Sequence, residues 1–311
     1  MLELIVAVTI TAPDLAAIEQ AYREWLDYEI VARGTVSREE AEQWAAPAVE
    51  GRAYLVMQPA SGEAVYLRFV EQAPMAGAEP LRTHGWNATE ILVEDPHALA
   101  QKLRDSPFRI IGEPRPLSMN PAIVAMQVIG PAGELLYLTR IPPGESAFGL
   151  GSARSFVDRV FIVVLGGADA SQMLEYYHAG YGLAITEPAP ARVGVLNREW
   201  GFADDHEIPL AIVRLPDSFL IEVDGYPAKA SKRPTRAGEL PPGMAIVSFA
   251  VDSLDAVDVP LLTQPRSLES MPYAGRRAAL ARGAAGELIE LIERASGDDV
   301  EPAEELEERE D

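Results

Sequence analysis

The sequence predicts an α+β fold made of tandem copies of one unit of a strand, a helix and further strands. Two observations predict it: the two halves repeat each other at a nearly constant spacing, and each half also looks internally doubled. Asp14 stands eight residues before Tyr22, and Asp169 stands eight residues before Tyr177, 155 residues further along. A strand-like apolar run precedes each aspartate and a helical pattern follows it, so we expect each aspartate to cap a helix.

The ends of the two halves match in the same way. Residues 130–138 read GPAGELLYL and residues 283–291 read GAAGELIEL, an offset of 153, while residues 66–69 fall opposite 220–223 at an offset of 154. In both 130–138 and 283–291 a glycine turn leads into an expected strand. Three landmarks thus agree within two residues, which indicates a duplication of about 150 residues.

Each half also divides into two units. The strand-like run 91–95 leads into a helical run at 98–103, and the strand-like run 247–251 leads, past Asp255, into another expected helix. The four units begin near Leu4, Gly85, Val157 and Gly243. The expected domains are an N-terminal one of two units (1–140), a Pro/Gly/Ser-rich linker (141–155), a C-terminal one of two units (156–295) and an acidic tail (296–311).

Composition excludes several classes of site and partner. The 311 residues include no cysteine, so disulfides, iron–sulfur ligation, zinc ribbons and a cysteine nucleophile are excluded. With only four histidines, any metal site would be rich in carboxylates. The net charge of -22 disfavours nucleic acid as a partner. No apolar run approaches the roughly 18 residues of a membrane helix, and the start lacks a basic leader, so we expect a cytoplasmic protein without membrane contact.

The repeated motifs resemble those of the vicinal oxygen chelate superfamily of glyoxalases, bleomycin-resistance proteins and extradiol dioxygenases. Tyr176-Tyr177 with Tyr181-Gly182-Leu183 is similar to that superfamily's helix signature. The GELL at 133–136 and the GELIE at 286–290 are similar to its closing strand. The resemblance implies βαβββ modules, paired into two half-barrel domains whose open clefts take a small organic molecule as the partner. A homodimer is compatible with this arrangement.

The resemblance also implies where a metal would bind. Metal-using relatives carry His or Glu on the first and last strands of a module. The N-terminal half offers Ala7, Arg68, Ala88 and Tyr137 at these places, and the C-terminal half offers Ile162, Glu222, Ile246 and Glu290. We therefore predict no metal ligands and no required cofactor, although two carboxylates could still hold Mg²⁺ or Mn²⁺, and an Fe²⁺ site of the usual histidine-containing kind is not available.

Glu222 and Glu290 are the predicted catalytic residues, because two acids buried near each other would form an acid/base pair. The alternative is that they pair with Arg159, Arg192 or Arg214 as structural carboxylates. The predicted ligand-binding residues each lie on a strand or loop near one of the expected clefts: Arg68, Glu90, Tyr137, Arg159 and His206. Arg68 and Tyr137 together could hold an anion, and Glu90 shares a strand face with Ala88. His206 lies in a polar loop and is either solvated or a mobile acid/base.

Three functions remain open. The first is binding or transformation of an apolar or aromatic metabolite by a lyase-like or isomerase-like protein without the usual histidine-based metal site. The second is a metal-dependent glyoxalase or ring-cleaving dioxygenase that uses Glu222 and Glu290. The third is a non-catalytic protein that sequesters a ligand, as bleomycin-resistance proteins do. No phosphate loop, Gly-x-Gly-x-x-Gly or Gly-x-Ser-x-Gly motif indicates a nucleotide cofactor or a serine nucleophile.

Overall fold

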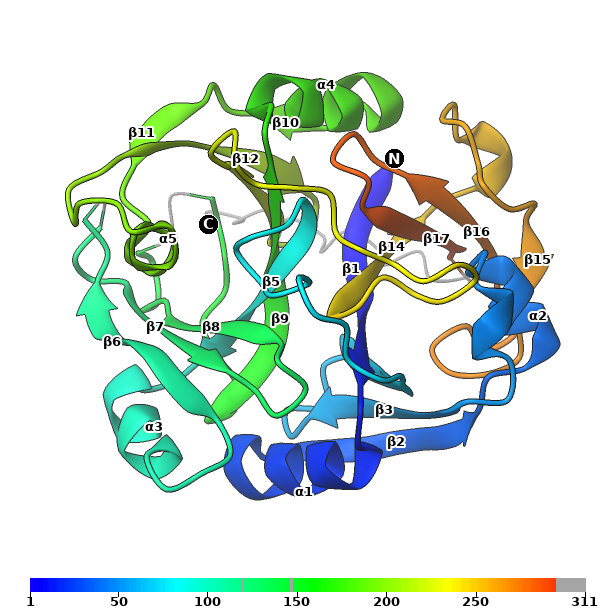
Figure 1. Ribbon diagram of the computed structural model, residues 1–311, viewed down its shortest axis with the longest axis horizontal. Coiled ribbons are helices and arrows are strands. Elements are labelled where there is room, and N and C mark those ends of the chain that lie inside the picture. The colour runs from blue at the N-terminus through cyan, green and yellow to red at the C-terminus, as the bar shows by residue number, and fades with distance from the viewer. Residues whose placement is uncertain (119, 146–147, 295–311) are drawn as a thin grey trace, which may run out of the picture.

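The computed structural model describes residues 1–118, 120–145 and 148–294. Its strands form two large curved sheets that lie side by side, with α1, α3 and α4 at the periphery (Figure 1). The predicted acidic tail lies outside the described residues. The described part of the chain contains no helix long and apolar enough to cross a membrane.

The first two βαβββ modules occupy the N-terminal half. Module 1 contains β1 (Leu2–Ala12), α1 (Leu15–Leu26), β2 (Tyr28–Thr35), α2 (Arg38–Gln43), the 3-10 turn η1 (Pro47–Val49), β3 (Ala53–Pro59) and β4 (Tyr66–Glu71). Module 2 contains β5 (Gly85–Val93), α3 (Pro96–Leu103), β6 (Arg109–Pro116), β7 (Val124–Ile129) and β8 (Leu135–Arg140). Described linker residues between β8 and β9 form neither helix nor strand.

The other two modules follow in the C-terminal half. Module 3 contains β9 (Val157–Gly167), α4 (Ala170–Tyr181), β10 (Ala184–Ile185), β11 (Ala189–Ala191), α5 (Gly194–Trp200), β12 (Ile208–Leu215) and β13 (Phe219–Gly225). Module 4 contains β14 (Met244–Val251), the 3-10 turn η2 (Leu254–Ala256), β15 (Arg266–Ser267), β16 (Arg277–Arg282) and β17 (Leu288–Glu293). The four predicted starting points thus coincide with β1, β5, β9 and β14.

The modules pair across the two halves of the sequence. The first sheet has the strand order β15-β16-β17-β14-β1-β4-β3-β2, and the second has the order β10-β12-β13-β9-β5-β8-β7-β6, with β11 beside β12. At the centre of each sheet an antiparallel strand pair joins two modules: β1 pairs with β14 in the first sheet, and β5 pairs with β9 in the second. The expected grouping of modules 1 and 2 in residues 1–140, and of modules 3 and 4 in 156–295, therefore does not describe the sheets. The first strands of all four modules are similarly apolar, so local sequence does not specify which two will pair.

The predicted helix caps are present. The side chain of Asp14 accepts hydrogen bonds from the backbone N–H groups of Ala16 and Ala17, and that of Asp169 accepts one from Gln172. These contacts satisfy N–H groups that a helix leaves unpaired at its first turn. The helix expected after Asp255 is wrong: only the three-residue turn η2 forms there. Pro260 stands four residues after the end of η2, and a proline disfavours helical backbone in the residue before it, which limits the room for a helix.

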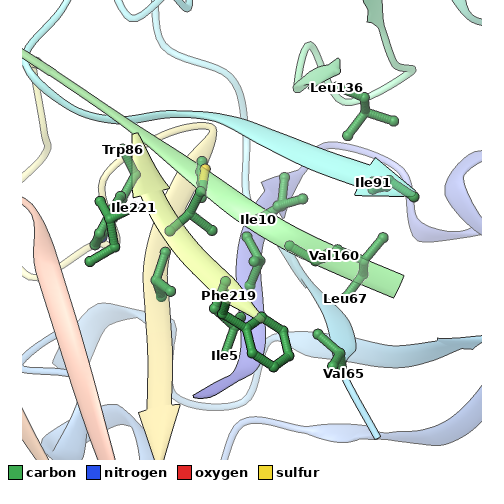
Figure 2. Close-up of a cluster of buried hydrophobic side chains, with 14 of the residues drawn as sticks. Ile5, Ile10, Val65, Leu67, Trp86, Ile91, Leu136, Val160, Phe219 and Ile221 are labelled. Atoms are coloured by element: carbon green, nitrogen blue, oxygen red, sulfur yellow. The ribbon is translucent and has the colours of Figure 1, made fainter. Parts of the chain in front are cut away.

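The main hydrophobic core lies between the two sheets and under the peripheral helices. Figure 2 shows side chains from both sheets meeting there, including Ile5 and Ile10 of β1, Val160 of β9 and Ile221 of β13. We call the face of each sheet that points away from this core its inner face. The inner face of the first sheet packs against Trp44, and that of the second curves around α5 (Figure 1).

Candidate functional site

A buried ion pair occupies the inner face of the first sheet. Nη2 of Arg68 on β4 lies 3.1 Å from Oε2 of Glu290 on β17, and neither side chain is exposed to solvent. Nε of Arg68 donates to Oγ1 of Thr9 at 2.9 Å, and the hydroxyl of Ser248 donates to Glu290. Parallel pairing places Thr9 beside Arg68 and Ser248 beside Glu290, so the four side chains project from neighbouring points of one face.

Two aromatic side chains cover this ion pair. Oη of Tyr273 donates to Oε1 of Glu290 at 2.6 Å and accepts from Nη1 of Arg68 at 2.8 Å. Nε1 of Trp44 donates to both Tyr273 and Glu290, and the guanidinium of Arg68 lies 4.5 Å from the Trp44 ring centre. Burial opposes the charge of Arg68, but its contacts with Tyr273 and Glu290 outweigh this effect and raise the pKa of the guanidinium. The inner face of the first sheet is thus a closed, internally satisfied polar network.

This network does not fit a metal ion. Arg68 and Glu290 stand on the last strands of their modules, where metal-using relatives carry ligands. The guanidinium already holds the Glu290 carboxylate, and its positive charge would repel a cation. The neighbouring positions supply only the hydroxyls of Thr9 and Ser248, which are weak ligands compared with carboxylates or imidazoles.

The inner face of the second sheet carries three acidic side chains. Glu90 comes from β5, and Glu222 and Asp224 come from β13. Alternation along β13 turns Glu222 and Asp224 to the same face, since residues two apart on a strand point the same way. Asp224 and Glu90 are buried, whereas Glu222 stays half-buried and reaches solvent. Glu222 is therefore the most accessible acid of this group, which we call the carboxyl cluster.

The acids of the carboxyl cluster have few hydrogen-bond or ion-pair partners. Glu90 accepts a hydrogen bond from the hydroxyl of Thr139, but both carboxyl oxygens of Asp224 are buried without a hydrogen-bond partner. Across the described residues, no basic side chain lies within ion-pair distance of any of the three acids. The buried phenol oxygens of Tyr137 and Tyr226 also lack partners. Unsatisfied buried polar atoms are uncommon in folded proteins, so this concentration calls for an explanation.

Burial and mutual repulsion shift the titration of these acids. Burial raises the pKa of Glu90 to about 7. Burial and the nearby Glu90 carboxyl raise that of Asp224 to about 7 as well. Burial, with Asp224 and Glu90 adding repulsion, raises the pKa of Glu222 well above its usual range. The same neighbours, after burial, raise the pKa of the Tyr137 phenol. The cluster therefore holds protons near neutral pH that isolated carboxyls would release.

The carboxyl cluster does not match a metal site either. No group of three or more His, Asp or Glu side chains in the residues that the structure describes is placed to hold a metal ion. The cluster contains no imidazole, and Asp224 sits among unpartnered phenols. Neither inner face, as far as the structure describes it, therefore presents the histidine-containing donor set that the resemblance implies for a metal site.

The structure separates residues that the sequence analysis grouped. Glu222 and Glu290 lie on different sheets, so they do not form the expected acid/base pair and do not share one ion. Arg68 and Tyr137 are also on different sheets, so a joint anion site is wrong. Of the suggested structural pairings, none forms: Glu290 pairs with Arg68, and Arg192 pairs with Glu207. Two predicted residues, Glu90 and Tyr137, lie on the same sheet as Glu222 and interact with it electrostatically.

Arg159 and His206 lie apart from the carboxyl cluster. The guanidinium of Arg159, near the start of β9, is 4.2 Å from the ring centre of Phe219. Among charged side chains, Glu63 and Asp158 affect its pKa most strongly. His206 is exposed in the loop between α5 and β12, where the centre of its ring lies 4.2 Å from that of Phe202, with the two rings tilted by 37°. Neither side chain contacts the acids, in agreement with the solvated-loop interpretation of His206.

Several residues of these two networks escaped prediction. Asp224 could have been found, because it stands two residues beyond Glu222 and the same rule was applied to Glu90. Tyr226 and Thr139 carry no comparable signal. Trp44 and Tyr273 reach the first inner face from segments that insert into their modules, so only the three-dimensional structure brings them to Glu290.

Comparison with known proteins agrees with this architecture. No protein-family model and no curated protein matches the sequence. Glyoxalase I from Zea mays has a similar structure over 93% of this chain and 92% of its own, with a TM-score of 0.60 and 14% identity. A "putative dioxygenase" from Bacillus subtilis matches over 94% of this chain and 85% of its own, with a TM-score of 0.60 and 12% identity. The chain therefore has the fold of the vicinal oxygen chelate superfamily, as its repeated motifs predict.

Proposed function

We propose that the inner face of the second sheet binds a small organic molecule and transfers a proton to or from it, with Glu222 as the exchanging carboxyl. The observation that carries this proposal is the carboxyl cluster itself. Three acids converge without a basic partner, and two phenols beside them have unpartnered oxygens. Perturbed acids that lack a compensating partner concentrate at functional sites.

Each member of the cluster has a separate role in this proposal. Glu222 is half-buried and so can meet a ligand that arrives from solvent. Its raised pKa makes the carboxylate of Glu222 a stronger proton acceptor than a free carboxylate, and proton transfer by a positioned side chain is the basis of general acid–base catalysis. Asp224 and Glu90 act as positioning residues, since their repulsion adds to the effect of burial in raising that pKa. The phenols of Tyr137 and Tyr226 are free to donate hydrogen bonds to a ligand oxygen.

The surrounding side chains favour a ligand with an apolar part. Ala88 and Val164 lie on the same face, and Val195 and Leu196 of α5 pack against it, so the acids have apolar neighbours. Apolar walls with a few polar groups are typical of small-molecule sites. The reaction class that suits a lone exchanging carboxyl is isomerisation or elimination next to a carbonyl group. Ligand sequestration without turnover is the competing function. We do not pursue the metal-dependent alternative that uses Glu222 and Glu290 together, because these two acids belong to different sheets.

Hydrogen–deuterium exchange tests the proposal without a known substrate. The purified protein is incubated in D2O with a mixture of small aldehydes, ketones and 2-oxo acids, and loss of C–H signals is followed by proton NMR. We expect exchange or conversion of at least one compound with the native chain. Glu222→Gln should slow that reaction by about 100-fold or more, because a general acid or base typically contributes a factor of this size to the rate.

The matched control is Glu187→Gln, because Glu187 is an exposed acid of the same module. This variant should keep the native rate. A compound that raises the melting temperature without exchange or conversion would support sequestration instead. Equal rates in both variants would remove Glu222 from the reaction.

A further inference from the structure

A second site lies where the two sheets meet, away from the carboxyl cluster. A pocket of about 410 Å³ is bounded by the start of β5, the turn between β16 and β17, and residues 232–235 of the connection that follows β13. None of the residues of the carboxyl cluster lines it. The pocket takes its walls from both sheets, because β5 belongs to the second and the β16–β17 turn to the first.

Basic side chains dominate the wall of this pocket. Three cations, Lys232, Arg233 and Arg282, line it in a chain whose net charge is -22. His84 lies beside them, and burial and the charge of Lys232 lower its pKa. The acid in the wall, Glu287, is already engaged: its oxygens accept hydrogen bonds from the Tyr177 phenol and the backbone N–H of Ala285. Burial also raises the pKa of Glu287 to about 7, which weakens its charge at neutral pH. The pocket is therefore locally positive.

Arg233 supplies a cation without a carboxylate counter-charge. Its guanidinium donates to the hydroxyl of Thr83 at 3.0 Å, to the carbonyl of Met244 at 2.7 Å and to the carbonyl of Trp86. All three acceptors are neutral, and within the described ranges no acid lies within ion-pair distance of Arg233. Burial lowers the pKa of Arg233 to about 10, so the side chain still carries its charge near neutral pH. An uncompensated cation of this kind is stabilised by a bound anion.

The other basic groups are available at the same wall. Arg282 is exposed and is oriented by a 3.1 Å hydrogen bond from Nη1 to the carbonyl of Gly286. Lys232 is exposed next to Arg233. Nε2 of His84 is buried without a hydrogen-bond partner. An oxyanion in this pocket would thus find two exposed cations, the hydrogen-bonded guanidinium of Arg233 and an unsatisfied ring nitrogen.

We propose that this pocket binds a small organic anion through a carboxylate or phosphate group, and that the bound anion bridges the two sheets. The proposal is independent of the acid–base function, since the two sites share no residue. Its probes are inorganic phosphate and acetate, titrated separately into the full chain by isothermal calorimetry at constant ionic strength. Saturable binding of at least one probe is expected. Tighter phosphate binding would indicate a phosphorylated ligand, and tighter acetate binding would indicate a carboxylic acid.

The variant that tests the location is Lys232→Gln with Arg282→Gln, in which two exposed cations are neutralised. It should bind the probe at least tenfold more weakly. The control is Arg23→Gln with Lys229→Gln, which removes the same charge from exposed positions outside the pocket and should bind like the native chain. Lys232→Gln alone serves as a second variant, with a smaller loss in the same direction. Absence of saturable binding by both probes, or equal loss in the pocket and control variants, would overturn the proposal.

Discussion

Tyr22 and Glu134 join the two sheets through a buried hydrogen bond. The phenol of Tyr22 on α1 donates to Oε1 of Glu134 at 2.7 Å, and Oε2 accepts the backbone N–H of Ala132 at 2.8 Å. The duplication repeats this contact, with Tyr177 on α4 donating to Glu287 at 3.0 Å. Each bond connects a helix from one sheet's modules to the glycine turn of the other sheet. The contacts therefore stabilise the packing of the two sheets against each other.

Removal of either phenol should destabilise the protein. In Tyr22→Phe the Glu134 carboxyl stays buried but loses its donor, which costs about 1–3 kcal/mol of unfolding free energy. Tyr177→Phe should do the same at Glu287. Urea unfolding measures both, with Tyr176→Phe as the control, since that half-buried phenol makes only a 3.5 Å contact with Tyr181. Native stability in both variants would contradict a role in joining the sheets.

The same two carboxyls should make stability fall as pH rises. Burial raises the pKa values of Glu134 and Glu287 to about 7, from an ordinary value of 4.5. Between these values the folded state keeps protons that the unfolded state has released, so a rise in pH favours unfolding. The loss begins near the unfolded pKa and is complete above the folded pKa. The double variant Glu134→Gln with Glu287→Gln should show a weaker decline between about pH 5 and 8 in urea unfolding. Parallel curves would show that these acids titrate normally.

The Arg68–Glu290 pair should be required for stability. Arg68→Met leaves the Glu290 carboxylate buried without its cation, and such a change costs about 3–5 kcal/mol. Adding Glu290→Met should recover part of that loss, because the unpaired charge is then gone. Arg33→Met removes an exposed arginine that lies 2.6 Å from Glu19, and it should change stability by no more than about 1 kcal/mol. Chemical unfolding of these variants compares the two arginines. Equal effects would mean that the first inner face is not a rigid structural network.

Gly166 should be needed to seat Tyr226. A Cβ atom at Gly166 would lie 2.3 Å from the Tyr226 ring, so Gly166→Ala must displace that ring or the strand. Overpacking of this kind costs about 1–3 kcal/mol. Gly151→Ala is the control, because nothing lies within 4 Å of its added carbon. Differential scanning calorimetry should show a lower melting temperature for Gly166→Ala alone. Similar melting of the two variants would contradict the close packing of Tyr226.

The sequence predicts the modules well because their signals are local. Aspartate caps, glycine turns and strand periodicity lie within a few residues of each other, and β1, β5, β9 and β14 begin where the pattern indicates. Module pairing is not local. The edge that β1 offers to β14 resembles the edge that it could offer to β5, so only the complete packing selects a partner. The three-residue turn η2 is a second case in which the local pattern misleads, since a nearby proline overrides an otherwise helical pattern.

The candidate site was predictable only in part for the same reason. Glu222, Glu90 and Tyr137 were identified from their places on strands, and each does face the inner side of the second sheet. Their association depends on the pairing of module 2 with module 3, which the residues themselves do not reveal. Glu290 was assigned to the same site because that pairing was unknown.

The unfolding free energy of Glu222→Gln near pH 8 tests the central claim most directly: that the second inner face keeps its acids for function, whereas the first keeps its ion pair for stability. Replacing Glu222 relieves repulsion from Asp224 and Glu90, so we expect the variant to be at least as stable as the native chain, by up to about 2 kcal/mol, while it loses proton exchange. A loss of stability comparable to that of Arg68→Met would contradict the account and assign Glu222 a structural role.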